Sequence, residues 1–378
     1  MSKLDELIKE LCSNGVEYKT IEAVTTMHRG VRVVRRDLEL DGLYPVYQNS
    51  LTPLGYMNEK NCDAGTTFVI SAGAAGEVGF STIDFWAADD CYYFDNNEFL
   101  DGCFLYHVLL SKQYYLFSQV RKASIPRLGR GIIEKMIIPV PPMEVQREIV
   151  RILDNFTELT AELTAELTAR MKQYEYYRGK LLSFDSKIQR YPLRDFVDFR
   201  NGKGHEKDIT VDGKYIVVNS KFIATNGEVR KYSDNQICPL YIDDILMVMS
   251  DLPNGRALAK CYLVEVDDKY TLNQRIGAFH VKSDVINTRF LFHVMNRNQQ
   301  LLSYDNGVDQ TNLRKDDILN ILIPVPSLDV QKRMVYVLDN FETICNDLRI
   351  GLPAEIEARQ KQYEYYRDKL LTFEELKQ

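Results

Sequence analysis

The sequence lacks most of the short motifs that identify enzymes and membrane proteins. Its 378 residues contain no uncharged apolar stretch approaching about 18 residues, which argues against a membrane span. The seven cysteines form no CxxC pair, and the N-terminus, MSKLDELIKEL, lacks the apolar core of a signal peptide. These absences predict a cytoplasmic protein with reduced thiols and no membrane partner.

Neither sign of charge dominates. Lys and Arg total 47 and Asp and Glu total 54, for a net charge of −7. This balance argues against a chain that coats nucleic acid by bulk charge, but it leaves room for local basic faces. At about 150 residues per domain, the length predicts two or three domains.

Catalytic and cofactor motifs are absent as well. There is no GxxxxGK[ST], no GxSxG, and no Asn-Pro of the kind that holds the target amine in base amino-methyltransferases. The five histidines show no metal-ligand spacing with each other or with cysteine, and His107 and His293 are expected in the core. We therefore predict no catalytic residue, no metal and no cofactor bound by this chain.

A tandem repeat is present. IPVPPMEVQREIVRILDNF (138–156) recurs as IPVPSLDVQKRMVYVLDNF (323–341), with 11 of 19 positions identical, and QYEYYRGKLLSF (173–184) recurs as QYEYYRDKLLTF (362–373). Two units of similar plan are expected, roughly 1–190 and 191–378, each with a divergent front part and a near-constant back part.

Weaker matches extend the repeat into the front parts. Gln48-Asn49-Ser50 matches Val218-Asn219-Ser220, Ser71 matches Ser250, and 125–133 matches 310–318.

The near-constant parts predict two long helices. An apolar seam steps by four and three residues through Val145, Ile149, Ile152, Phe156, Leu159 and Leu163, and the repeat TELTAELTAELTA (157–169) continues it. A helix over 143–184 would be about 63 Å long. The second seam runs through Val330, Met334, Val337, Phe341, Ile344 and Leu348. Gly351 and Pro353 are expected to break or kink the second helix, near the four residues by which the second copy is longer than the first.

The front parts combine strand and helix patterns. TTFVIS, KYIVVNS and DILMVMS predict strands, and 99–118 and 288–302 predict helices. The fold class is therefore α/β (mixed α+β), with two globular domains joined by two long antiparallel coiled-coil helices in a pseudo-two-fold tandem repeat. The predicted boundaries are 1–138 for the first globular domain, 139–187 for a central helical spacer, 188–323 for the second globular domain and 324–378 for a distal helical spacer.

Basic and amide side chains gather at equivalent places in both front parts. Arg can bond guanine, Asn and Gln can bond adenine, and Arg and Lys also hold phosphates. By contrast, 143–184 carries six basic and seven acidic residues, which suits protein contact better than DNA. The predicted DNA-binding residues are Arg29, Arg32, Arg35, Arg36, Gln48, Asn49, Ser50, Arg127, Arg130, Arg200, Lys203, Asn219, Ser220, Lys221, Asn226, Arg256, Asn273, Gln274, Arg275, Asn312, Arg314 and Lys315.

The chain resembles the specificity subunit of Type I restriction-modification systems over essentially its whole length. The resemblance rests on two divergent domains that alternate with helices carrying IPVP…Q…LD.F and QYEYYRxKLL. The resemblance implies that each globular domain is a target recognition domain that reads one half of a bipartite, asymmetric double-stranded DNA site. It implies that the helices set the gap and dock two modification (methyltransferase) subunits. It also implies that S-adenosylmethionine, ATP and magnesium are bound by partner subunits, which can include restriction subunits.

Two other functions remain open from the residues alone. The chain can be a protein-interaction scaffold with a coiled-coil spacer, or a metal-dependent nuclease that uses Asp251 and Asp267. Steep salt dependence of duplex binding would separate DNA recognition from the scaffold, because counterion release accompanies phosphate contacts.

Overall fold

The computed structural model describes residues 3–122, 124–205, 207–346 and 351–376. The chain forms two compact units, Met1–Glu166 with Ala354–Gln378, and Leu167–Pro353, called the first and second unit below. These units differ from the sequence repeats, because the C-terminal segment belongs to the first unit. Helix α6 (Met143–Leu181) passes from the first unit into the second.

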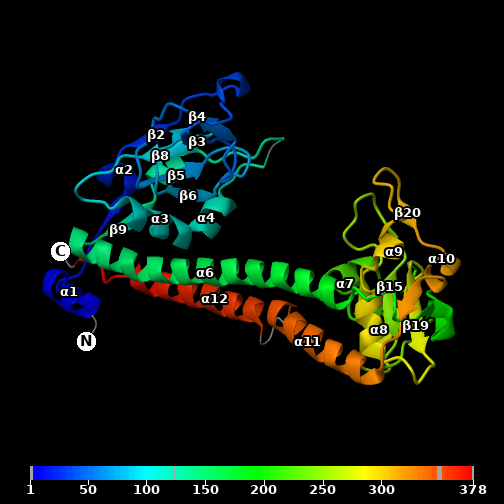
Figure 1. Cartoon of the computed structure of the whole chain (residues 1–378). Helices are drawn as coiled ribbons and strands as arrows, with labels where there is room; N and C mark the ends of the chain where they lie inside the picture. Colours follow the sequence, from blue (N-terminus) through cyan, green and yellow to red (C-terminus); the bar gives the residue numbers. More distant parts are fainter. Residues whose placement is uncertain (1–2, 123, 206, 347–350, 377–378) are drawn as a thin grey trace. The chain divides into compact units, whose positions relative to one another are not determined.

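The first unit contains a globular mixed α/β part. Its four-stranded sheet has the order β2-β8-β5-β6 and a three-stranded sheet has the order β4-β3-β7, in which β3 and β7 are parallel (Figure 1). Its elements are α1 (Lys3–Leu11), β1 (Glu17–Thr20), α2 (Ile21–Val24), β2 (Met27–Arg29), η1 (Arg35–Asp37), β3 (Tyr44–Tyr47), β4 (Gly55–Met57), β5 (Thr66–Ile70), β6 (Val78–Ser81), β7 (Trp86–Ala87), β8 (Cys91–Phe94), α3 (Gly102–Ser111), α4 (Gln113–Ser118), α5 (Arg130–Glu134) and β9 (Ile137–Val140).

The second unit repeats this plan. One sheet has the order β11-β19-β15-β17 and another has the order β12-β14-β13-β18, with β13 and β18 parallel. Its elements are β10 (Arg190–Pro192), η2 (Leu193–Asp195), β11 (Val197–Asn201), β12 (Ile209–Thr210), β13 (Tyr215–Val218), α7 (Ser220–Ala224), β14 (Tyr232–Ser233), β15 (Ile245–Val248), β16 (Ser250–Asp251), β17 (Cys261–Leu263), β18 (Tyr270–Leu272), β19 (Ile276–Val281), α8 (Thr288–Met295), α9 (Gln299–Leu302), β20 (Thr311–Asn312), α10 (Lys315–Leu319) and β21 (Leu322–Pro324).

Each globular part packs on two antiparallel helix segments. In the first unit the start of α6 lies beside α12 (Leu352–Leu370), where Phe156 stacks on Tyr366 with ring centroids 5.3 Å apart (Figure 1). In the second unit the end of α6 lies beside α11 (Leu328–Asn346), where Tyr177 stacks on Phe341 at 6.0 Å. The predicted mixed α/β fold with long antiparallel helices is therefore confirmed. Among the described residues, no helix has the length and apolar character needed to cross a membrane.

The helix predictions need three corrections. Helix α6 ends at Leu181 rather than at 184, and the predicted helices 99–118 and 288–302 are each divided in two, as α3 with α4 and α8 with α9. The interruption expected at Gly351 and Pro353 is confirmed, since Gly351 lies in a bend and α12 begins at Leu352, with Pro353 in its first turn; Leu348 lies outside the described residues.

The apolar seam of α11 is displaced from the predicted one. Of the predicted seam, Met334 is buried and Phe341 partly buried, but Val330, Val337 and Ile344 are exposed. The other buried residues of the helix are Gln331, Leu338 and Cys345. On α6, Leu153 is fully buried and Ile152 only partly. The displacement has a physical cause. The globular part packs against α11, in addition to the partner helix, and it buries the line of residues that contains Gln331.

Candidate nucleic-acid interface

Three loops of the first unit meet beside β5. The Ala74 amide donates to the Asn49 carbonyl at 2.9 Å, and the Leu128 amide donates to the Ser71 carbonyl at 2.8 Å. A bridge between Ala72 and Arg127 completes the contact. We call this region the first loop cluster, comprising 48–50, 71–74 and 126–128. It brings the predicted residues Gln48, Asn49, Ser50 and Arg127 together.

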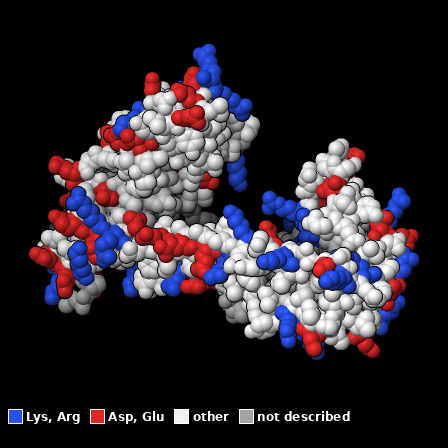
Figure 2. Space-filling view, viewed as in Figure 1, with Lys and Arg blue, Asp and Glu red and all other residues white. Residues whose placement is uncertain are grey.

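The basic segment 28–36 approaches the first loop cluster at one end. Arg29 donates through Nε to the Asp89 carbonyl at 2.8 Å, and the next carbonyl, of Asp90, accepts from Ser71 at 2.7 Å. Arg32, Arg35 and Arg36 are exposed further along this segment and take no part in the bonds that join these loops. On the face shown in Figure 2, Lys and Arg side chains project from this globular part.

In the second unit four loops meet in the corresponding place. The Asn273 amide donates to the Val218 carbonyl at 3.1 Å, which joins the loops after β18 and β13. Met249 donates to Arg275 at 3.1 Å and accepts from Leu313 at 2.8 Å, which brings in the loops beside β16 and β20. We call this region the second loop cluster, comprising 218–221, 249–256, 273–275 and 312–315.

A hollow of about 390 Å³ lies in the second loop cluster. It carries three cationic side chains, three side-chain amides and one hydroxyl among described residues, and no carboxylate is part of its lining. The lining residues are Asn219, Ser220, Lys221, Lys231, Asn273, Gln274 and Arg275. Six of them were predicted from the sequence. Lys231 was missed, although the basic pair Arg230-Lys231 was a signal for it.

Several residues predicted to bind DNA do not line the hollow. Lys203 lies beside the hollow without lining it: its amide donates to the Leu272 carbonyl at 3.1 Å, and it forms a β-bridge with Asn273. Asn226 follows α7 in the left-handed region, with φ of 50°, and does not line the hollow. The remaining predicted residues of the second loop cluster are exposed: Arg256, Asn312, Arg314 and Lys315.

Two predicted arginines are engaged inside their own domain. Arg130 donates to Glu134 at 2.7 Å and to the Met27 carbonyl at 2.8 Å. Arg200 pairs with the fully buried carboxylate of Asp244 and donates to the Pro239 carbonyl at 3.0 Å. Arg200 thus compensates the charge of a buried carboxylate that also accepts from the Tyr241 amide at 2.9 Å and lies 3.0 Å from His280 Nδ1.

The aspartates of the nuclease hypothesis also have structural contacts. Asp251 accepts from the Leu252, Ala257 and Leu258 amides at 2.8–3.1 Å and so closes the turn that carries Arg256. Asp267 accepts from the Ile242 amide at 2.7 Å. Neither belongs to a cluster of potential metal ligands among the described residues.

The hydrogen bonds correct how the two repeats match. Leu128 bonds Ser71 as Leu313 bonds Met249, so Ser71 corresponds to Met249 and not to Ser250. Likewise the Ala88 amide donates to the Tyr47 carbonyl, as the Asn273 amide does to the Val218 carbonyl. Tyr47 therefore corresponds to Val218, and Gln48 corresponds to Asn219 and not to Val218. Both sequence-based matches are wrong by one residue, because each aligned an identical residue type across loops of unequal length.

The repeated helix motif anchors each globular part. Buried Gln146 accepts from the Asp101 amide at 2.9 Å and donates to the Phe99 and Pro141 carbonyls at 2.8 and 2.7 Å. Its counterpart Gln331 accepts from Asn287 at 2.7 Å and donates to Val285 and Pro326 at 3.0 and 2.8 Å. The glutamine of the IPVP…Q motif therefore ties α3 or α8 to the long helix.

A histidine and an aspartate reinforce each anchor. His293 Nε2 lies 2.7 Å from Asp339, which also receives Arg289 at 3.0 Å. Burial acts to raise the pKa of Asp339, but the hydrogen bond from His293 and the charge of Arg289 hold it below its usual value. Burial raises the pKa of the neighbouring Glu342.

In the first unit the corresponding pair is His107 and Asp154, with Cys103 in place of the arginine. Burial, together with the charges of Asp154 and Asp101, raises the pKa of the Cys103 thiol. The sequence-based expectation that no histidine lies at ligand spacing to a cysteine was wrong, because Cys103 and His107 are one turn apart on α3. Both histidines are buried, as expected.

Comparisons with known proteins agree with this architecture. A family model described as type I restriction modification DNA specificity domain matches residues 13–173 and again 185–358. A putative type I restriction enzyme specificity subunit of Haemophilus influenzae is 30% identical over 97% of this chain and 98% of that protein. The EcoR124I/EcoR124II specificity subunit of Escherichia coli is 30% identical over 99% of this chain and 98% of that protein.

Solved structures support the same fold. The S subunit of a Type I restriction-modification system from M. genitalium aligns over 94% of this chain and 96% of that one, with a TM-score of 0.61 at 17% identity. A chain from a study of complex assembly and conformational transition in the type I system aligns with a TM-score of 0.59 at 15% identity, over 94% and 97%. With two family matches, two loop clusters and near-complete coverage, this chain belongs to the type I restriction-modification DNA specificity subunits.

Proposed function

We propose that the first loop cluster reads one half of a bipartite, asymmetric duplex site and the second loop cluster reads the other half. The hollow in the second unit carries this proposal, since it combines Lys221, Lys231 and Arg275 with amide side chains that suit adenine edges. The cations suit phosphates, which fix the register of a protein on DNA. In this proposal the chain is itself non-catalytic, and methylation and cleavage belong to partner subunits.

The test begins by finding the DNA site. Mapping N6-methyladenine in the source genome, with this gene present and deleted, should show one gapped motif that is lost on deletion. The complex of this chain with its modification subunits is then assayed on DNA in which one half-site at a time is randomised. We expect Arg275→Ala to relax or weaken one half and Arg127→Ala the other, by about 1–3 kcal/mol each.

Lys361→Ala, on the exposed side of α12, is the control and should leave both halves unchanged. Equal effects of Arg127→Ala and Arg275→Ala on both halves would refute the assignment of one half-site to each unit.

We also propose that two modification subunits dock on the helices through the repeated motif QYEYYR. Tyr176 and its counterpart Tyr365 are 64% and 62% exposed, while the other tyrosines of each motif pack against neighbouring helices. Exposed aromatic side chains are typical anchors of protein interfaces. Two equal surfaces suit two copies of one partner, to which S-adenosylmethionine would bind; ATP and magnesium would belong to restriction subunits.

The docking proposal predicts stoichiometry. Tyr176→Ala or Tyr365→Ala should each reduce the bound modification subunits from two to one at limiting concentration, and the double variant should bind neither. Native mass spectrometry of the reconstituted complex measures this. Tyr336→Ala is the matched control, because Tyr336 is exposed on α11 but corresponds to Arg151 in the first repeat. Loss of both partners from a single variant, or of neither from the double variant, would exclude this surface.

A further inference from the structure

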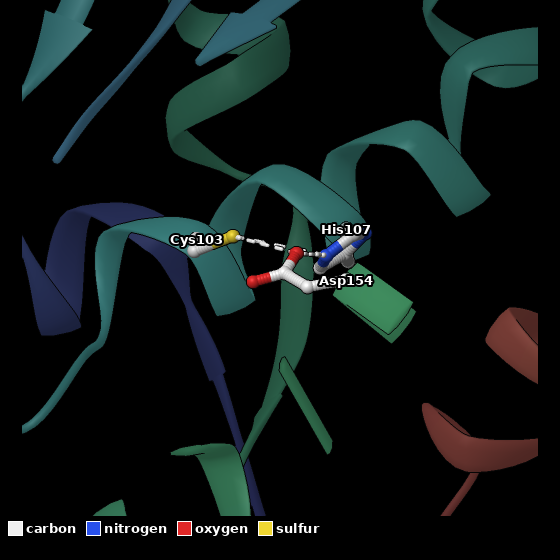
Figure 3. Close-up of side chains that lie close together, drawn as sticks. All are labelled: Cys103, His107 and Asp154. Carbon is white, nitrogen blue, oxygen red and sulfur yellow. Dashed lines mark hydrogen bonds and ion pairs between the residues drawn. The ribbon is translucent and has the colours of Figure 1, made fainter. Parts of the chain in front are cut away.

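Three potential metal ligands converge where α3 meets α6 in the first unit (Figure 3). Cys103 Sγ lies 3.7 Å from His107 Nε2 and 3.7 Å from Asp154 Oδ1, and His107 Nε2 lies 3.4 Å from the same carboxylate oxygen. The three atoms therefore form a nearly equilateral triangle drawn from two helices.

The triangle has the dimensions of one face of a tetrahedral zinc site. Zinc binds sulfur at about 2.3 Å and histidine nitrogen or carboxylate oxygen at about 2.0–2.2 Å, so tetrahedral ligands lie about 3.6 Å apart when sulfur is one of them and about 3.4 Å apart for nitrogen and oxygen. A direct hydrogen bond between His107 and Asp154 would be shorter, at about 2.7–2.9 Å. The His107–Asp154 separation therefore matches the edge of a metal site better than a direct hydrogen bond, while the two sulfur distances suit either arrangement.

The surroundings prepare His107 for this role. Its side chain is 1% exposed, and Nδ1 lies 2.9 Å from the hydroxyl of Tyr363. When Nδ1–H donates to that hydroxyl, Nε2 presents its lone pair to the triangle, as metal-binding histidines commonly do. Asp154 is 56% exposed, so solvent can reach the triangle and water can supply a fourth ligand.

The second repeat supplies an internal comparison. There His293 and Asp339 lie at a hydrogen-bond distance of 2.7 Å, and Arg289 occupies the position of Cys103 and bonds the aspartate. The positive charge that Asp339 receives from Arg289 has no counterpart at Asp154, since no described ion pair joins Asp154 to a lysine or arginine. The same anchor thus has a guanidinium in one unit and a thiol in the other.

We propose that Cys103, His107 and Asp154 bind one divalent transition-metal ion of the zinc type, with water as the fourth ligand, and that this ion ties α3 to α6. Binding displaces the thiol proton to solvent and leaves a thiolate ligand. The ion would cross-link the globular part and the long helix at the place where Arg289 does so in the second unit.

The test uses Co²⁺ as a spectroscopic substitute for Zn²⁺ in the full-length chain, under reducing and anaerobic conditions. We expect one equivalent of Co²⁺ per chain with a thiolate-to-metal charge-transfer band in the near ultraviolet, and a rise in the midpoint of thermal unfolding with Zn²⁺. Cys103→Ser should abolish the band and the rise, and Asp154→Asn should weaken binding by more than about tenfold.

Two further variants make the result specific. Cys238→Ser removes another partly exposed thiol and should keep the band unchanged. Arg289→Cys places a thiol at the matching position of the second unit and should add a second equivalent of thiolate-bound Co²⁺. No charge-transfer band in the unmodified chain, or an undiminished band in Cys103→Ser, would overturn the proposal.

Discussion

Gln146 and Gln331 show how one buried side chain can position a whole domain. Each makes three hydrogen bonds, two of which join the start of α3 or α8 to the start of α6 or α11. The bonded partners are backbone groups that have been removed from water, so loss of the glutamine leaves them unsatisfied. The constancy of this residue between the two repeats follows from the bonds it makes.

Replacing Gln331 tests this role. Gln331→Leu keeps the volume but removes three bonds, and we expect the free energy of unfolding of the second unit to fall by about 2–4 kcal/mol. Chemical denaturation measures the change. Exposed Gln299→Leu serves as the control, with an expected change under about 0.5 kcal/mol. A change in Gln331→Leu no larger than the control would mean that these bonds do not stabilise the domain.

At this scale the sequence predicted residue types better than exact positions. Six residues that line the hollow were predicted, because basic and amide side chains stand beside turns. Arg130 and Arg200 resembled them in sequence, yet the Met27 carbonyl and Asp244, which engage their guanidinium groups, lie close to them only after folding. Cys103 and Asp154 are 51 residues apart and meet only because α3 packs on α6.

Helices α6, α11 and α12 follow the repeat in the sequence closely. The periodicity and the preceding prolines predicted the starts of α6 and α11, and Gly351 and Pro353 predicted the interruption before α12. The buried line on α11 was not predictable from apolar residues alone, because the buried polar Gln331 belongs to it while the apolar Val330 and Val337 are exposed.

Changing the length of α6 tests the helix as a spacer. Adding one TAEL unit within 157–169 lengthens the helix by about 6 Å, and base pairs stack about 3.4 Å apart. We expect the gap in the methylated motif to grow by one or at most two base pairs, with both half-sites unchanged, as read by methylation mapping.

Exchanging one existing TAEL unit for TAQL, which preserves the length, is the control and should keep the original gap. An altered half-site, or an unchanged gap after insertion, would contradict the spacer role.

Over the whole molecule, the compact units cross the boundary between the repeats. The first unit is completed by the C-terminal segment, in which the Glu374 carbonyl accepts from the Val16 amide at 2.8 Å and Phe373 packs against the core. The equivalent Phe184 packs on the core of the second unit. The duplication was evident from the sequence, but two near-identical helices cannot reveal which copy packs on which domain.

A matched pair of variants tests this arrangement. Phe373→Ala should destabilise the first unit, and Phe184→Ala the second, each by about 1–3 kcal/mol because the rings are partly buried. Hydrogen exchange followed by mass spectrometry locates the lost protection. Loss of protection around β1 and β9 in Phe184→Ala, rather than in Phe373→Ala, would contradict the assignment.

Because residues 354–378 complete the first unit, this unit can finish folding only after the second unit has been synthesised. The first globular part is synthesised early, but helix α12 from Ala354 onward and Glu375, which forms a β-bridge with Val16, are synthesised only after every residue of the second unit. Domains usually finish folding in the order in which they are made. Here the unit that is translated first is completed last. A product truncated before residue 354 would therefore contain the whole second unit but only part of the first.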